Sequence, residues 1–168
     1  MPDDIIDLIL ADHAEFRRAF AELDGLTDHA ELARRWLALA DHLEVHASAE
    51  EEVFYPELLQ EVDNSEGDTK HAVKDHNKIR DATRATGAHE VGTQAWWEAF
   101  RDARAETVDH LDEEENDVLP PFREQIDAQT RRRLATDWQA FHERHKRARG
   151  LSGEDKDPED YVEDKATD

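Results

Sequence analysis

The stretch that decides the fold is HASAEEEVFYP, which occupies residues 46–56. The chain repeats this pattern as HLDEEENDVLP at residues 110–120, where the histidine, the fourth residue after it and the proline fall at matching places. Each of these two motifs is preceded by one member of a second similar pair, DHAEFRRAF at residues 12–20 and DHNKIRDAT at residues 75–83. The chain therefore contains an internal repeat, and its two halves supply the same polar pattern twice.

Long segments rich in Ala, Leu, Glu, Asp and Arg surround these stretches, and the glycines fall between the segments. This composition, with apolar residues at three- and four-residue steps, predicts an all-α protein. Pro56 should kink the second helix, and Pro120 with Pro121 should end the fourth. Helices are expected at about residues 3–23, 27–59, 69–86, 93–118 and 128–149.

The order of these helices predicts the domain organisation. The first four are typical of an antiparallel, up-down four-helix bundle over residues 1–126. The fifth is predicted to be an additional C-terminal helix, packed on the outside of the bundle within residues 127–150. The acidic tail, residues 151–168, has few apolar side chains to bury, so we predict that it is disordered.

Composition excludes several classes of function. The chain has 168 residues, with 43 acidic against 21 basic side chains and a net charge of −22. This charge excludes a nucleic-acid binder that works by neutralising phosphates, and it disfavours docking on an anionic membrane. The absence of cysteine excludes thiolate metal sites and disulfides. An acidic start and no apolar run near the ~20 residues of a membrane span predict a cytoplasmic protein.

The predicted bundle places histidines where a core should be apolar. Each of the first four helices carries one histidine on its apolar stripe, and in two helices a glutamate follows four residues later, on the same face. A buried carboxylate without a partner costs roughly several kcal/mol, and a cation bound between the helices would remove that cost. The predicted metal ligands are His13, His46, Glu50, His76, His110 and Glu114. A core network of hydrogen bonds is the alternative interpretation.

The repeat also predicts how many ions the site holds. Two similar half-sites suggest two metal ions, with Glu50 and Glu114 as bridges between them. Four imidazoles and two carboxylates suit iron, and also Mn, Co or Zn. The ferritin type of di-iron site needs a glutamate three residues before a histidine, and no histidine of this chain has one.

In spacing and order, these motifs resemble the hemerythrin-like, or HHE cation-binding, domain family over about residues 3–125. The resemblance implies a hemerythrin-like bundle with a non-heme di-iron centre, oxo- or hydroxo-bridged, held by the six residues named above. It also implies a diatomic or peroxide ligand. Oxygen-carrying hemerythrins have another histidine where this chain has Arg80, and a carboxylate at the position of Glu115. The missing histidine favours the branch associated with iron handling, oxygen or redox sensing, or peroxide and nitric oxide chemistry.

We therefore expect a di-iron protein that binds or reacts with O2, peroxide or NO in sensing or in oxidative-stress defence. The alternatives are an iron storage or sensor protein without catalysis, and a single structural zinc in a helical interaction module. Peroxide decomposition at the centre and the oligomeric state are left open.

Four further side chains, which are not among the six predicted ligands, could lie near the metal site or at the surface. Tyr55 is interpreted as a core or interface tyrosine, with a phenolate ligand as the alternative. His42 is interpreted as a flanking histidine of the bundle, with a role as a ligand or beside one as the alternative. His71 is interpreted as a surface residue, with a role as a ligand as the alternative, and His142 is expected to be solvated.

Overall fold

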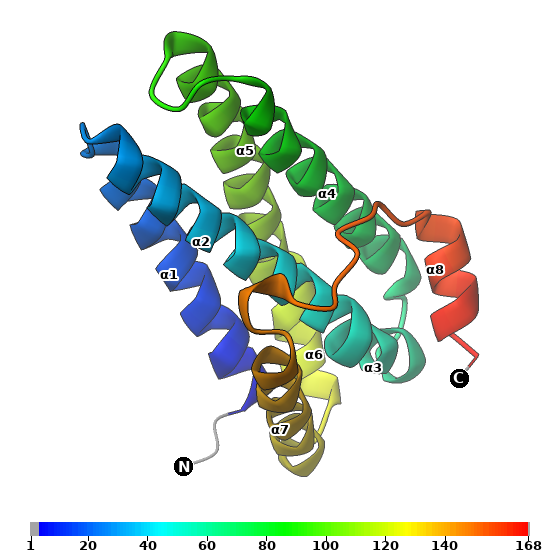
Figure 1. Ribbon diagram of the computed structural model, residues 1–168. Helices are drawn as coiled ribbons and strands as arrows, with labels where there is room; N and C mark the ends of the chain where they lie inside the picture. Colours follow the sequence, from blue (N-terminus) through cyan, green and yellow to red (C-terminus); the bar gives the residue numbers. More distant parts are fainter. Residues whose placement is uncertain (1–3, 168) are drawn as a thin grey trace.

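The computed structural model describes residues 4–167, and these residues form helices without strands. The all-α prediction is therefore confirmed. Four long helices lie side by side, and consecutive ones run in opposite directions along the bundle (Figure 1). They are α1 (Ile5–Asp24), α2 (His29–Ala49), α4 (Glu66–Ala85) and α5 (Gln94–Glu113). No helix in this part of the chain combines the length and apolarity that a membrane crossing requires.

Helix α2 passes into a widened turn at the first repeated motif. A π-helical turn, Glu50–Phe54, follows α2 and leads directly into α3 (Tyr55–Glu61), with Pro56 in its first turn. At ~100° per residue, positions 50 and 55 of a regular α-helix would point about 140° apart. The π-turn has fewer degrees per residue, so both Glu50 and Tyr55 face the interior and are fully buried.

Helix α5 has the same interruption at the same place in the second half. A π-helical turn, Glu114–Val118, is followed by α6 (Leu119–Gln125). Pro120 and Pro121 therefore do not end the helical segment as predicted. A proline in the first turn of a helix lacks only an N–H group that would be unpaired there, so α6 begins at the prolines.

The apolar core is divided into two parts by a polar layer. One cluster gathers at the end of the bundle that includes α3, α6 and α7 (Ala128–Arg144), with Ile9, Phe54 and Val73 among its members. The other fills the opposite end, around Phe16 and Phe100. The histidines of the four long helices lie between these clusters, so the layer is sealed by apolar side chains on both sides.

The C-terminal segment differs from the prediction of a disordered tail. Helix α7 (Ala128–Arg144) lies against α1 and α2, as expected for an extra helix. A short 3-10 turn (Lys146–Ala148) and an extended connection then lead across α2 to α8 (Pro158–Lys165), which packs against α3 and α4 (Figure 1). Tyr161 and Val162 of α8 are buried. These two apolar side chains dock α8, although acidic residues dominate the segment.

Candidate metal centre

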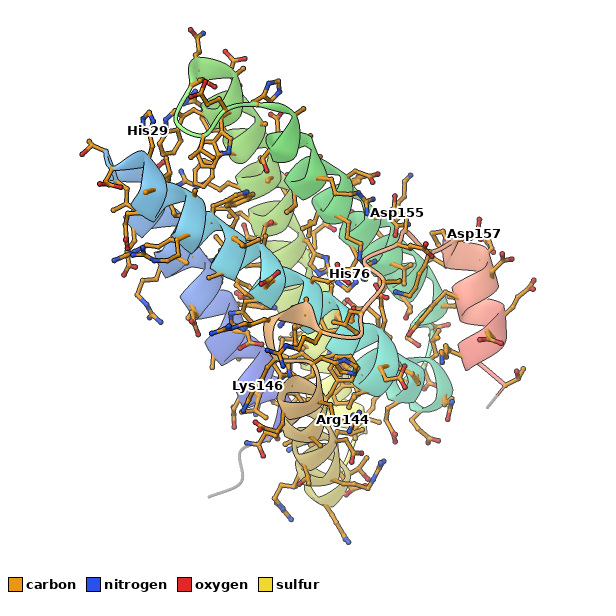
Figure 2. The ribbon with its side chains drawn as sticks, viewed as in Figure 1. His29, His76, Arg144, Lys146, Asp155 and Asp157 are labelled. Carbon is orange, nitrogen blue, oxygen red and sulfur yellow. The ribbon has the colours of Figure 1, made fainter. Side chains whose placement is uncertain are left out.

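The six predicted ligands meet in the polar layer, and all of them are buried. They come from different elements: α1, α2 and its π-turn, α4, and α5 and its π-turn. Figure 2 shows His76 of α4 inside the bundle, whereas Lys146 and Asp157 lie toward its outside. The residues that the structure brings together are His13, His46, Glu50, His76, His110 and Glu114.

The first half-site is formed by His13 and His46 with one oxygen of each glutamate. His46 Nε2 lies 3.0 Å from Glu50 Oε1, and His13 Nε2 lies 3.4 Å from Glu114 Oε1. The four residues offer donor atoms that all lie within 4.8 Å of one another. Two imidazole nitrogens and two carboxylate oxygens thus converge on one point, as the ligands of a metal ion do.

The second half-site uses the other oxygen of each glutamate. His76 Nε2 lies 3.0 Å from Glu50 Oε2, and His110 Nε2 lies 3.7 Å from Glu114 Oε2. The Nε2 atoms of His76 and His110 are 3.2 Å apart. Glu50 therefore belongs to both groups of converging donor atoms, and Glu114 faces the second half-site through His110 alone. A carboxylate that faces both half-sites is the arrangement that a bridge needs.

Several of these donor atoms have no hydrogen-bond partner among residues 4–167. His13 Nε2, His46 Nε2, Glu50 Oε1 and Glu114 Oε1 are buried and make no hydrogen bond. Buried polar atoms are nearly always paired, because an unpaired one loses its hydration without compensation. All four unpaired atoms belong to the first half-site, so a cation would satisfy them together. The residues present therefore fit a metal ion.

A carboxylate lies behind every one of the four histidines. Because a carboxylate only accepts, each histidine Nδ1–H points to it, and the lone pair of Nε2 is left facing the centre. The distances from Nδ1 to the carboxylate oxygen are 2.9 Å for His13 with Glu115 and for His46 with Asp12, 2.8 Å for His76 with Glu51, and 3.5 Å for His110 with Asp75.

Sequence reasoning missed Asp12, Glu51 and Asp75, and it considered Glu115 only as a carboxylate position of the related family, although the repeat carried a signal for all four. Asp12 and Asp75 each precede the lone histidine of their half, and Glu51 and Glu115 each follow the predicted bridging glutamate. Residues that orient a ligand must repeat with it, so matching acids at the two offsets were the available evidence.

The carboxylates make the centre favourable for positive charge. Burial alone would lower the pKa of His46, but the charge of Glu50 and the hydrogen bond with Asp12 raise it to about 10. Burial also opposes ionisation of Glu51, yet His76, Arg80 and Lys156 lower its pKa to about 2. The same environment that would protonate an imidazole in the absence of metal also favours binding of a cation.

Glu51 and Glu115, the two outer glutamates behind the histidines, each accept a hydrogen bond from an arginine. The two arginines occupy matching positions of the repeat. Arg17 donates to Glu115 over 2.7 Å, and Arg80 donates to Glu51 over 3.1 Å. The Arg80 side chain is only 4% exposed, whereas that of Arg17 is 36% exposed. The sequence predicted a departure from oxygen-carrying hemerythrins at Arg80, and the structure shows what this arginine contacts.

Tyr55 is buried in the core, as predicted, and its hydroxyl also contacts both predicted bridging glutamates. Its hydroxyl donates to Glu114 Oε2 at 2.8 Å and to Glu50 Oε2 at 3.1 Å, and it lies 3.3 Å from His76 Nε2. Burial and the charges of Glu114 and Glu50 raise the pKa of this phenol well above its usual value. Tyr55 therefore holds a proton directly against both predicted bridges.

The other histidines take different places. His71 is more than half exposed, as predicted, and pairs with Glu113 at 2.6 Å. His42 flanks the bundle and contacts Asp12, the carboxylate behind His46. His142 differs from the expectation of a solvated residue, because it is half-buried and also contacts Asp12.

The fold and the site define a helical protein with a buried cluster of histidines and carboxylates suited to cations. The family model of the hemerythrin HHE cation-binding domain matches residues 4–122, and the chain therefore belongs to that family. A DNA nickase of Nostoc sp. (strain PCC 7120) is 24% identical to the chain over 136 residues, which are 81% of this chain and 38% of the nickase. The chain thus spans well under half the length of that relative. No solved structure matches it.

Proposed function

We propose that this chain is a non-heme di-iron protein that binds or reacts with O2, peroxide or NO in sensing or oxidative-stress defence. His13 and His46 would hold one ion, and His76 and His110 the other. Glu50 and Glu114 would bridge the two ions. One observation carries the proposal: each of these glutamates directs one oxygen to each pair of histidines, in a buried layer with unpaired donor atoms.

The chemistry of the donor set supports iron. Imidazole and carboxylate together suit iron among the first-row metals, and when bound, two iron ions would supply redox reactivity toward small oxygen and nitrogen species. The protein's own residues bind and enclose the ions. Phe16 and Phe54 lie in the clusters on either side of the layer and exclude water, and the Tyr55 hydroxyl keeps a proton beside both glutamates.

The site favours this function over the two alternatives. A single structural zinc takes four ligands, and this layer offers six, divided between two half-sites. An iron store must release its ions, whereas these donors are buried between two apolar clusters. The enclosed arrangement is that of a permanently bound cofactor.

We do not propose a nicking activity for this chain, although it is similar to a DNA nickase. Contact with DNA depends largely on basic side chains that neutralise phosphates. This chain has a net charge of −22 and covers only 38% of the nickase. An incubation with supercoiled plasmid and Mg²⁺ tests the exclusion, and we expect no conversion to the nicked form.

Metal analysis with an optical spectrum tests the main proposal. We expect about two irons per purified chain and charge-transfer bands in the near-ultraviolet. One zinc per chain without colour would overturn the proposal. Added peroxide then separates the roles: oxygen evolution indicates a catalyst, while a spectral change without turnover indicates a sensor.

A further inference from the structure

A second group of metal-ligating side chains lies outside the buried centre. Asp12 of α1, His42 of α2 and His142 of α7 offer donor atoms that all lie within 4.8 Å of one another. Asp12 Oδ1 is 3.3 Å from His42 Nε2, and Asp12 Oδ2 is 3.5 Å from His142 Nε2. Unlike the buried centre, these side chains reach solvent, with 17% of Asp12, 26% of His42 and 25% of His142 exposed.

The hydrogen bond of His142 shows which of its nitrogens is free. Its Nδ1 lies 3.0 Å from the carbonyl oxygen of Trp138, and a carbonyl can only accept, so Nδ1 carries the hydrogen. In a neutral ring, the lone pair of Nε2 then faces the Asp12 carboxylate. This Nε2 atom is buried and has no hydrogen-bond partner. A lone pair directed at an anionic oxygen is unfavourable unless a proton or a metal cation lies between them, and the position is therefore suited to either.

Solvent and ions can reach the cluster. His42 and His142 both line a surface hollow of about 550 Å³, together with Asp41 and the turn that follows α7, whereas Asp12 is not part of its lining. An ion held between Asp12 and the two imidazoles could take water into its remaining positions from this hollow.

We propose that Asp12, His42 and His142 form a second, solvent-facing site for a divalent first-row transition-metal ion. Two nitrogens and one oxygen suit such ions better than they suit Mg²⁺ or Ca²⁺, which prefer oxygen ligands. His142 lies beyond the residues that the family model matches, 4–122, so this site depends on the additional helix α7. It does not depend on which metal the buried centre holds.

This second site, called the outer site below, shares Asp12 with the surroundings of the buried centre. Asp12 Oδ2 also accepts from His46 Nδ1 at 2.9 Å. One carboxylate therefore orients a ligand of the inner centre and contributes to the outer site. An ion bound by Asp12 would reduce the negative charge that His46 meets, and the two sites would be coupled through this carboxylate.

Calorimetric titration of the purified, metal-loaded chain with Zn²⁺ tests the proposal. We expect one zinc to bind to the wild type without loss of the metal already present, which is measured in the same sample by elemental analysis. The double variant His42→Gln/His142→Gln should lose this binding event. It should retain its helical circular dichroism and its original metal content, because neither residue is an inner ligand.

His71→Gln is the matched control, since His71 forms the comparable exposed cluster of the second half with Asp75 and Glu113. This variant should bind zinc as the wild type does. Loss of the event in His71→Gln, unchanged binding in the double variant, or uptake of zinc only by exchange with the inner metal would each overturn the proposal. An iron-free inner centre would contradict the proposed function, yet the outer site could still be measured.

Discussion

The first half of the molecule, α1 to α3, and the second half, α4 to α6, surround the metal centre with the same residue types at matching positions. Each half gives a lone histidine with an aspartate before it, a His-x-x-x-Glu pair with a glutamate after it, and an arginine that holds the other half's outer glutamate. The halves differ where Tyr55 in the first corresponds to Leu119 in the second. They also differ in the C-terminal helices packed on them, because α7 packs against α1 and α2 of the first half, whereas α8 packs mainly against α4 of the second half and also contacts α3.

This comparison separates two kinds of requirement. The positions that repeat are the predicted metal ligands and the residues that contact them, and both half-sites would need them equally. The positions that do not repeat give the two half-sites different hydrogen bonds and ion pairs. The first half alone supplies a hydroxyl, that of Tyr55, to the predicted bridging glutamates. Of the two arginines, only Arg80 of the second half is buried, beside Glu51 and under the C-terminal segment, whose Lys156 contacts the same glutamate.

The largest expected effect comes from a residue that serves both half-sites. Glu50→Ala with Glu114→Ala should abolish metal binding, because the four histidines alone leave neither ion with an anionic ligand. Glu50→Ala alone should reduce occupancy at both half-sites. Elemental analysis of the purified variants measures the result, and full occupancy would refute the bridging role.

Removal of the metal should lower thermal stability, since it leaves buried donors unpaired in both halves. Saturation at a thousandfold excess over Kd contributes about 4 kcal/mol, which corresponds to roughly 8 °C or more in Tm for a chain of this size. Melting curves of the metal-free and reloaded protein measure the change. An unchanged Tm would argue that the polar layer is stable by itself.

The two arginines should differ in their contribution to stability. Arg80→Ala breaks buried pairs with Glu44 and Glu51, and the loss of one partner of a buried ion pair typically costs about 3–5 kcal/mol. Arg17→Ala removes exposed pairs, for which about 0–1 kcal/mol is usual. Urea unfolding of both variants measures the difference. Equal destabilisation would contradict the asymmetry between the halves.

The smallest effect on metal content should come from the residue that is present in one half only. Tyr55→Phe removes one hydroxyl that contacts two glutamates, and a hydrogen bond to a charged group contributes about 1.5–3 kcal/mol, so both ions should remain bound. The near-ultraviolet bands should shift, because the donor to both bridges is lost. Leu119→Met is the control at the matching position and should leave the bands unchanged. A Tyr55→Phe spectrum identical to that of the wild type would separate Tyr55 from the centre.

The sequence carried enough information for the six central residues because two signals coincided there. His13, His46, His76 and His110 interrupt apolar stripes, and the offsets of 63 and 64 residues repeat them. The sequence predicted Tyr55 as a core residue but not its contact with both glutamates, because a regular helical period turns it away from Glu50 and the π-turn brings both inward. Widened turns of this kind have no composition of their own.

The contacts of the C-terminal helices were also beyond prediction from the sequence. His142 meets Asp12 across 130 positions of chain, and no local pattern specifies that pairing. Tyr161 and Val162 are two apolar residues among many acids, so composition indicated disorder. Their burial arises from tertiary packing on the surface that α3 and α4 present.

X-ray absorption of the iron-loaded protein tests the central claim most directly, because it reports the atoms around each iron. We predict a scattering path between two iron atoms, together with imidazole scattering that corresponds to two histidines per iron, and we predict that Glu50→Ala weakens the iron–iron path. Iron with imidazole neighbours but no second iron atom would contradict a centre built from two bridged half-sites.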